Sequence, residues 1–152
     1  MALVDLIDLP ETGPLIGIDP GSKTLGIAAC DALRLIASPV KTINRSKLSA
    51  DLDALFDEFD TRAAVGLVIG LPLNMDATEG PRAQSARAFA RNVLNFRDIP
   101  VALQDERMSS AQAERAMLEA DLSRARRAEL IDASAAAVIL QTAIDRLANS
   151  SG

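Results

Sequence analysis

The stretch Leu15-Ile16-Gly17-Ile18-Asp19-Pro20-Gly21-Ser22 decides the fold of this chain. Its apolar first half predicts a short buried strand, and the Asp-Pro-Gly-Ser sequence that follows is a strong turn signal. We expect a second strand over residues 24–30 and a third over residues 35–43, in which Pro39 marks an edge or a bulge. Strands this close in sequence predict an antiparallel meander.

Beyond the meander, the spacing of the apolar residues becomes helical. Residues 48–59 carry leucine and phenylalanine at helical spacing, with acids on the opposite face. Residues 64–70 form a continuous apolar run, which is typical of a strand covered on both sides. Pro81 suits the first position of a helix that ends near Phe96, and residues 101–104 predict a fifth strand.

The last third of the chain predicts two helices. Residues 109–112, Ser-Ser-Ala-Gln, read as a capping box that opens the first of them. Residues 123–128 read as a basic link, and residues 133–147 as a helix so apolar in its first turns that it must be buried. This order of elements predicts an α/β fold: a five-stranded mixed sheet, first a meander and then parallel strands, with helices on both faces.

Composition excludes several classes of function. The 152 residues, 49% of them hydrophobic, suit one domain with a sizeable core. The sequence has no histidine and a single cysteine, Cys30, which removes Ser-His-Asp, Cys-His and histidine- or thiolate-ligated metal chemistry. Any metal must then be a hard cation held by oxygen. We find no signal peptide and no apolar run of membrane-spanning length, so we expect no membrane partner.

The formal net charge of −5 at first argues against a nucleic-acid partner, but the acids are unevenly distributed. Residues 1–14 hold three acids and no base, and we interpret them as an acidic extension before a domain over residues 15–148 and a tail over residues 149–152. Five further acids gather in residues 51–60, which predicts one local acidic face. The rest of the chain is mildly basic, so nucleic-acid binding is allowed.

Three groups of carboxylates stand at the ends of predicted elements. Asp19 ends the first strand, Asp105 and Glu106 follow the fifth, and Asp132 precedes the last helix. Each has an ordinary structural explanation: a turn in which Gly21 allows positive φ, a solvated loop, and a helix N-cap. Taken together in a chain without histidine, they favour one or two Mg²⁺ or Mn²⁺ ions that activate water for phosphodiester hydrolysis.

The loop over residues 70–80 is longer than an ordinary strand-to-helix connection, and we expect Leu73 and Met75 to be exposed in it. Its amides and the helix that begins near Pro81 could meet a phosphate. Seven basic residues are candidates for contact with phosphate: Lys23, Arg82, Arg87, Arg107, Arg124, Arg126 and Arg127. The last three form the best cluster.

Four blocks of sequence together resemble the YqgF family, also called RuvX, of pre-16S rRNA nuclease or Holliday-junction-resolvase-like proteins. The blocks are Gly17-Ile18-Asp19-Pro20-Gly21, IGLPLNMDATEG (69–80), DERMSS (105–110) and IDASAAAVIL (131–140). They follow the order and spacing of the family over about residues 15–147. The loop and the DER block are specific, whereas the first block is shared with actin-like ATPases.

The resemblance implies an RNase H-like fold and a cytoplasmic bacterial protein. It also implies a divalent-metal nuclease for structured nucleic acid, with maturation of the 16S rRNA 5′ end as its role. Carried over by motif, the catalytic and metal-binding triad is Asp19, Glu106 and Asp132, and Asp105 could replace or assist Glu106. Ala77 departs from the family pattern, which usually has glycine there, so a turn with positive φ at that position is in question.

Several functions remain open on the sequence. We favour an endonuclease for an rRNA precursor, with Lys23, Asn74, Arg107, Arg124, Arg126 and Arg127 as substrate contacts, over a resolvase of four-way DNA junctions. A resolvase needs a symmetric dimer to cut two strands, and the sequence allows a monomer or a homodimer. A nucleotide-binding module like the actin-like ATPases needs a second similar domain, for which 152 residues leave no room. A non-catalytic nucleic-acid-binding factor is the fourth interpretation.

Overall fold

A five-stranded mixed sheet forms the centre of the computed structural model. The structure describes residues 3–74, 76–105 and 124–151, and for residues 124–132 and 150–151 it describes the backbone alone. The strands are ordered β3-β2-β1-β4-β5. β1 pairs antiparallel with β2 and parallel with β4, and β4 pairs parallel with β5. Their bounds are β1 Leu15–Pro20, β2 Thr24–Cys30, β3 Ala37–Asn44, β4 Gly66–Leu71 and β5 Val101–Asp105. The predicted sheet is confirmed.

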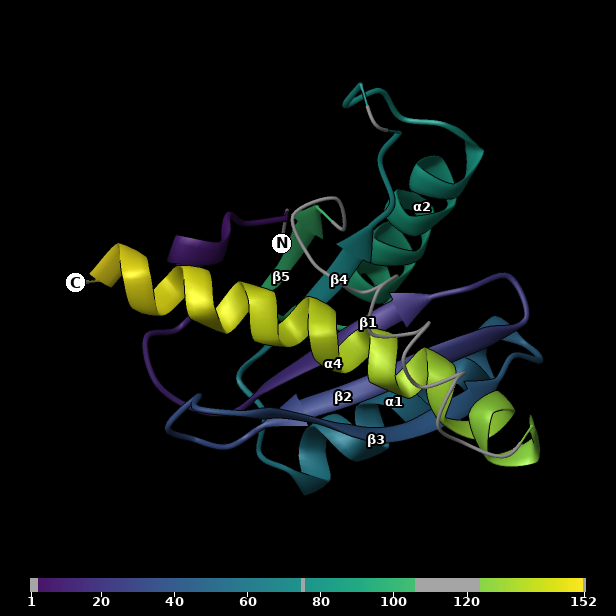
Figure 1. Ribbon diagram of the computed structural model, residues 1–152, viewed down its shortest axis with the longest axis horizontal. Coiled ribbons are helices and arrows are strands. Elements are labelled where there is room, and N and C mark those ends of the chain that lie inside the picture. The colour runs from purple at the N-terminus through teal and green to yellow at the C-terminus, as the bar shows by residue number, and fades with distance from the viewer. Residues whose placement is uncertain (1–2, 75, 106–123, 152) are drawn as a thin grey trace.

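Helices cover both faces of this sheet, as the sequence predicts (Figure 1). α1 (Leu48–Thr61) and α2 (Pro81–Phe96) lie on one face, and the long helix α4 (Arg124–Ser151) crosses the other. A short 3-10 helix, η1 (Leu6–Asp8), packs on the same face as α4. None of the described helices combines the length and the apolar character that crossing a membrane requires.

Large side chains fill the space between the sheet and the pair α1 and α2. Ile16 and Ile18 of β1 and their neighbours on β2 and β4 pack against Leu55, Phe56 and Phe89 in one continuous cluster. The strand residues alternate with those that face α4, as the two-residue period of a strand requires. This face therefore holds most of the bulky apolar volume that stabilises the domain.

Several alanines and one glycine take part in the contact between α4 and the sheet. Ala136, Ala143 and Leu140 of α4 pack against Ala28 and other residues of the sheet in a separate cluster. At Gly17 the helix comes close to the strand: a Cβ there would lie 2.7 Å from Leu140 Cβ and 3.0 Å from the carbonyl oxygen of Ala136. Glycine is therefore needed at position 17 to let the helix backbone approach the central strand.

The structure corrects the predicted start of the last helix. α4 already begins at Arg124, so residues 124–128 are its first turn and not a link. Asp132 consequently lies inside the helix, where it cannot be an N-cap. The reason is that Arg and Ala, which dominate this basic stretch, are good helix formers. The helix expected to open at residues 109–112 lies outside the described residues.

The position of Pro39 agrees with the prediction for the third strand. β3 is an edge strand, and its register with β2 shifts between Ile27 and Ala28, beside the pair of Ala28 with Pro39. Pro39 cannot donate to the ladder, so an edge with an irregular register is where a strand tolerates it.

Residues of the N-terminal segment pack against the domain. Val4 forms a parallel bridge with Ala102 and donates its N–H to the Val101 carbonyl at 2.9 Å. Leu6 and Leu9 are buried beside α4, and the guanidinium of Arg34 donates to the carbonyl of Gly13 at 2.8 Å. The segment thus covers part of the outer edge of β5, which would otherwise present unpaired backbone groups.

Candidate active site

Asp19 lies at the end of β1, the central strand, and only 6% of the residue is exposed. Ile16 and Ile18 face α1 and α2, so alternation along the strand places Asp19 with Gly17 on the face covered by α4. The carboxyl ends of parallel strands are where open α/β sheets place their ligands. A buried carboxylate at this position is therefore a strong candidate for chemistry.

The backbone of α4 brings Asp132 toward the same end of the sheet. Ile144 and Leu147, near the end of α4, line a pocket with Leu9 and Leu33, which lie at the side where β1 begins. The helix therefore runs antiparallel to β1, and its contact with Gly17 is made by Ala136 and Leu140. Position 132 lies one helical turn before Ala136, a displacement of about 6 Å along α4. Asp19 lies two residues beyond Gly17, a displacement of about 7 Å along β1.

Most of the other side chains predicted for the site lie outside the part of the chain that the structure describes. Glu106 and Arg107 lie outside the described residues, as do the side chains of Asp132, Arg124, Arg126 and Arg127. Asp105 closes β5 in register with Leu71. Strand alternation places Asp105 with Val101 and Leu103, on the α1 and α2 side and opposite to Asp19.

Gln104 is a polar residue of this region that we did not anticipate. It is completely buried, its amide oxygen accepts a hydrogen bond from Arg146 Nη1 at 3.1 Å, and its amide nitrogen donates to the Asp105 carbonyl at 3.0 Å. The bond from Arg146 ties α4 to β5. The signal in the sequence was a single amide at the end of the apolar run Val101-Ala102-Leu103.

The loop between β4 and α2 closes on itself through Asn74. Its backbone N–H donates to the Thr78 carbonyl at 2.9 Å, and its side-chain amide donates to Thr78 Oγ1 at 3.0 Å. Ala77 keeps a positive φ of 72°, so the turn that glycine usually makes persists here with alanine. Leu73 packs partly buried against Leu71 and α2, which corrects its predicted exposure. Met75 lies outside the described residues.

Lys23 is exposed in the turn between β1 and β2, four residues after Asp19. The turn is closed by the Gly21 N–H, which donates to the Thr24 carbonyl at 2.9 Å. Gly21 is not among the residues with positive φ, so the reason predicted for this glycine is wrong. A Cβ at Gly21 would instead lie 2.8 Å from the Thr24 carbonyl oxygen, and it is this close approach that requires glycine.

The acids of α1 lie on the far side of the sheet from Asp19, because α1 and α4 cover opposite faces. Asp53, Asp57 and Asp60 are exposed there. Asp51 departs from the predicted acidic face: it is 2% exposed, accepts the Ser46 N–H at 3.0 Å and lies 3.7 Å from Arg45 Nε. It is therefore a structural acid at the start of α1.

A divalent cation is compatible with the donors at this end of the sheet. The carboxylate of Asp19 offers the oxygen ligand that Mg²⁺ and Mn²⁺ prefer. Within the described part of the chain no three potential metal-ligating side chains cluster together. Two of the three predicted ligands, however, belong to side chains beyond that part.

Solved structures with the same architecture identify the fold. A structure described as "T. thermophilus RuvC in complex with Holliday junction substrate" matches with a TM-score of 0.56 and 15% identity, over 90% of this chain and 96% of that one. The yeast mitochondrial Holliday junction resolvase Ydc2 matches with a TM-score of 0.53 and 11% identity, over 96% and 84%. The chain thus has the RNase H-like fold of these resolvases.

Sequence comparison then gives the family. The RuvX family model, described as "Holliday junction resolvase", matches residues 13–146. A Phenylobacterium zucineum protein named "Putative pre-16S rRNA nuclease" is 54% identical over 98% of this chain and 99% of its own length. A Rhodobacter capsulatus protein of the same name is 57% identical over 93% and 89%. The chain belongs to the RuvX family of nucleases, which are hydrolases of phosphodiester bonds.

Proposed function

We propose that this protein is a divalent-metal-dependent endonuclease of the cytoplasm that matures the 5′ end of 16S rRNA. The observation that carries the proposal is the buried carboxylate of Asp19 at the end of the central strand, on the face that α4 covers. The carboxyl end of a central strand is where open α/β sheets place their ligands, which makes a role in chemistry the better explanation.

Asp19, Glu106 and Asp132 would hold the cation. When bound, the cation lowers the pKa of a water ligand and stabilises the oxygen that leaves phosphorus. The protein's part is to hold the three carboxylates from β1, the segment after β5, and α4. The rigidity of the contact between Gly17 and α4 supports this arrangement, because a backbone contact at van der Waals distance leaves little freedom to shift.

Basic and amide side chains hold the nucleic acid in this proposal. They are Lys23, Asn74, Arg107, Arg124, Arg126 and Arg127. Lys23 is exposed beside the strand that carries Asp19, and the arginines of the first turn of α4 belong to the helix that covers Asp19. Contacts of this kind position the substrate by its phosphates and do not read its sequence.

The names of the relatives favour an rRNA precursor as substrate, whereas the structural neighbours favour a second candidate, a four-way DNA junction. Resolving a junction requires two active sites related by a two-fold axis. A dimer in solution together with cleavage of a junction would replace the first candidate with the second. Binding of either substrate without any cleavage would identify a non-catalytic factor.

Asp19→Asn tests the proposal because it keeps the size of the side chain and removes the charge that a cation needs. We expect cleavage of a precursor RNA with Mn²⁺ to be lost while the thermal midpoint without metal is unchanged or rises, since like charges at the site repel one another. Asp53→Asn, on the exposed face of α1, is the matched control and should cleave normally. Wild-type cleavage by the Asp19 variant would remove this residue from the mechanism.

A further inference from the structure

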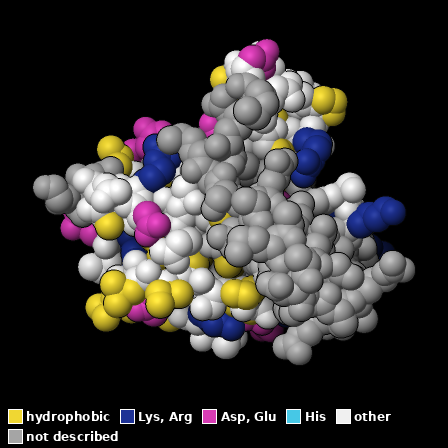
Figure 2. Space-filling model, viewed as in Figure 1, with side chains coloured by type: hydrophobic (Ala, Val, Ile, Leu, Met, Phe, Trp, Pro, Cys, Tyr) yellow, Lys and Arg dark blue, Asp and Glu magenta, His cyan; other side chains and the backbone are white. Residues whose placement is uncertain are grey.

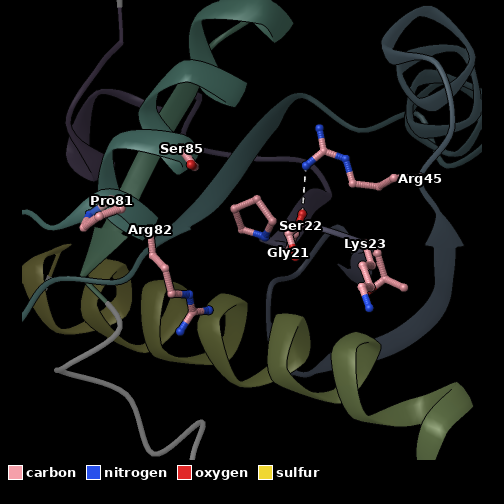
Figure 3. Close-up of a pocket in the computed structure, with 9 residues that line it drawn as sticks. Gly21, Ser22, Lys23, Arg45, Pro81, Arg82 and Ser85 are labelled. Atoms are coloured by element: carbon pink, nitrogen blue, oxygen red, sulfur yellow. Dashed lines mark hydrogen bonds between the residues drawn. The ribbon is translucent and has the colours of Figure 1, made fainter.

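A pocket of about 510 Å³ opens between the turn that follows β1 and the first turn of α2. Gly21, Ser22 and Lys23 line it from the turn, Arg45 from the end of β3, and Arg82 and Ser85 from α2 (Figure 3). In Figure 2, blue side chains flank this hollow at the right of the view. Pro20, the residue after Asp19, also lines the pocket, so the pocket lies at the end of the strand that carries the candidate catalytic residue.

Three of the lining side chains are cationic, and none of the described residues that line the pocket is acidic. Within the part of the chain that the structure describes, neither Lys23 nor Arg82 forms an ion pair. Figure 3 shows these two side chains extending from opposite walls of the pocket toward the side where α4 lies. Cations that line one pocket with no ion-pair partner among the described residues favour the binding of an anion there.

Arg45 has a different part in the pocket. Its Nη1 donates to the Gly21 carbonyl at 2.8 Å, its Nε lies 3.7 Å from the buried Asp51 carboxylate, and its guanidinium stands 5.5 Å from the centroid of the Phe89 ring. These contacts hold the turn against α1 and α2. Arg45 thus fixes the wall that carries Lys23, and Lys23 and Arg82 supply the charge available to a ligand.

The wall formed by α2 favours an anion as well. The helix begins with Pro81 after Gly80, and Gly80, as the N-cap residue, has no side chain to cap the first turn. The positive end of the helix dipole therefore adds to the field of Arg82 in the same wall. The hydroxyls of Ser22 and Ser85 supply neutral donors beside the cations. Cations, hydroxyls and a helix N-terminus converging on one hollow make up the chemistry that recognises phosphate.

We propose that this pocket binds one non-scissile backbone phosphate of the nucleic acid, held by Lys23 and Arg82 together. The proposal rests on the proposed function, since it is the substrate of Asp19 that would supply the phosphate. Because Pro20 connects Asp19 directly to the pocket, a phosphate bound there fixes the register of the strand at the active site. Lys23 and Arg82 are positioning residues, acting through the placement of the substrate.

The test measures binding in EDTA, where no cleavage occurs, with a fluorescein-labelled single-stranded RNA of about 20 nucleotides. The variants are Lys23→Gln, Arg82→Gln and the double variant, and Arg91→Gln is the matched control from the exposed side of α2. All three positions are exposed, so we expect the thermal midpoints of all four variants to be like that of wild type. Competition by ATP, measured on wild type and the double variant, separates a backbone phosphate from that of a free nucleotide.

We expect each single variant to weaken RNA binding about tenfold relative to Arg91→Gln and to lower the slope of log K against log salt by about one. The double variant should lower that slope by about one and not by two, because both cations hold the same phosphate. RNA binding equal to that of the control would overturn the proposal, as would tight ATP binding that the double variant abolishes. A failure of Asp19→Asn to stop cleavage would leave these binding results unaffected, so the two proposals fail separately.

Discussion

The two faces of the sheet are packed in different ways. Between the sheet and α1 and α2, the contacts are made by isoleucine, leucine and phenylalanine. Between the sheet and α4, alanines take part beside leucine, isoleucine and valine, and the bare backbone of Gly17 meets the helix. The first face buries more apolar volume, while the second brings a helix backbone close to the strand that carries Asp19. The comparison indicates that the α1 and α2 face contributes most to stability, whereas the α4 face sets the geometry of the site.

The physical reason is the length of the side chains. Large side chains separate the backbone of a helix from that of a sheet. When one of them is truncated, the neighbouring side chains relax into part of the space that it leaves. Alanine and glycine put the backbones themselves in contact, so that a single added methyl group has no flexible neighbour to displace. Residues on α4 are thus placed relative to β1 more strictly than residues on α1 or α2. Three substitutions test this division, in order of expected effect on stability.

Leu55→Ala removes a fully buried side chain from the α1 and α2 face. We expect the free energy of unfolding to fall by about 3 kcal/mol, because apolar burial is lost and a cavity remains. Nuclease activity per folded molecule should stay near that of wild type, since α4 and Asp19 lie on the other face. Urea unfolding and a cleavage assay below the transition measure the two quantities. Loss of activity in the fully folded variant would show that the faces are not independent.

Gly17→Ala places a methyl group against Leu140 Cβ and the Ala136 carbonyl oxygen. We expect a loss of about 2 kcal/mol from overpacking. Because α4 must move away from β1, cleavage should also fall in the folded variant, and more than it does in Leu55→Ala. The same two assays apply, and retention of full activity would mean that the close approach of α4 is dispensable.

Gly66→Ala is the matched control for that substitution on the neighbouring strand. A Cβ at Gly66 would meet the side-chain ends of Leu9 at 3.1 Å and Leu15 at 3.3 Å, which can rotate away. The cost should therefore be smaller than at Gly17, and cleavage should be unchanged. Equal losses in the two variants would attribute the effect to replacing any strand glycine and not to the contact with α4.

Ala63→Gly acts at the end of α1 and should have the smallest effect. Ala63 has φ of 54°, its N–H donates to Asp60, and the N–H of Ala64 donates to Phe59 at 2.9 Å, so α1 ends in a Schellman motif with alanine where glycine is favoured. Relief of the left-handed conformation outweighs the added freedom of the unfolded chain, for a net gain of about 0.5 kcal/mol.

Urea denaturation measures this gain, and Ala54→Gly inside α1 is the control. The same change of residue there should cost about 1 kcal/mol, since glycine is a poor helix former. Destabilisation by both substitutions would show that the turn after α1 has no strain to relieve. Cleavage should be unchanged in either variant, because both positions belong to the face remote from Asp19.

The strands and α2 were predictable because local signals agreed with tertiary structure. Pro81 begins α2 and Phe96 ends it, as the sequence predicts. The start of α4 was not predictable, because the change from basic to apolar residues looked like a boundary. The burial of Asp51 and its contact with Arg45 were not predictable either. No local sequence pattern distinguishes an acid that will pack beside an arginine from an acid that will lie in water.

The sequence by itself determined the period of each element, the order of elements and the chemistry open to a chain without histidine. These follow from residue type and spacing, which act over a few neighbours. Only the tertiary structure decided that α4 meets Gly17 at backbone distance, that Asp19 faces it, and that Lys23, Arg45 and Arg82 come from three separate elements to one pocket. Those contacts join residues far apart in the chain, and the packing of whole elements sets their geometry.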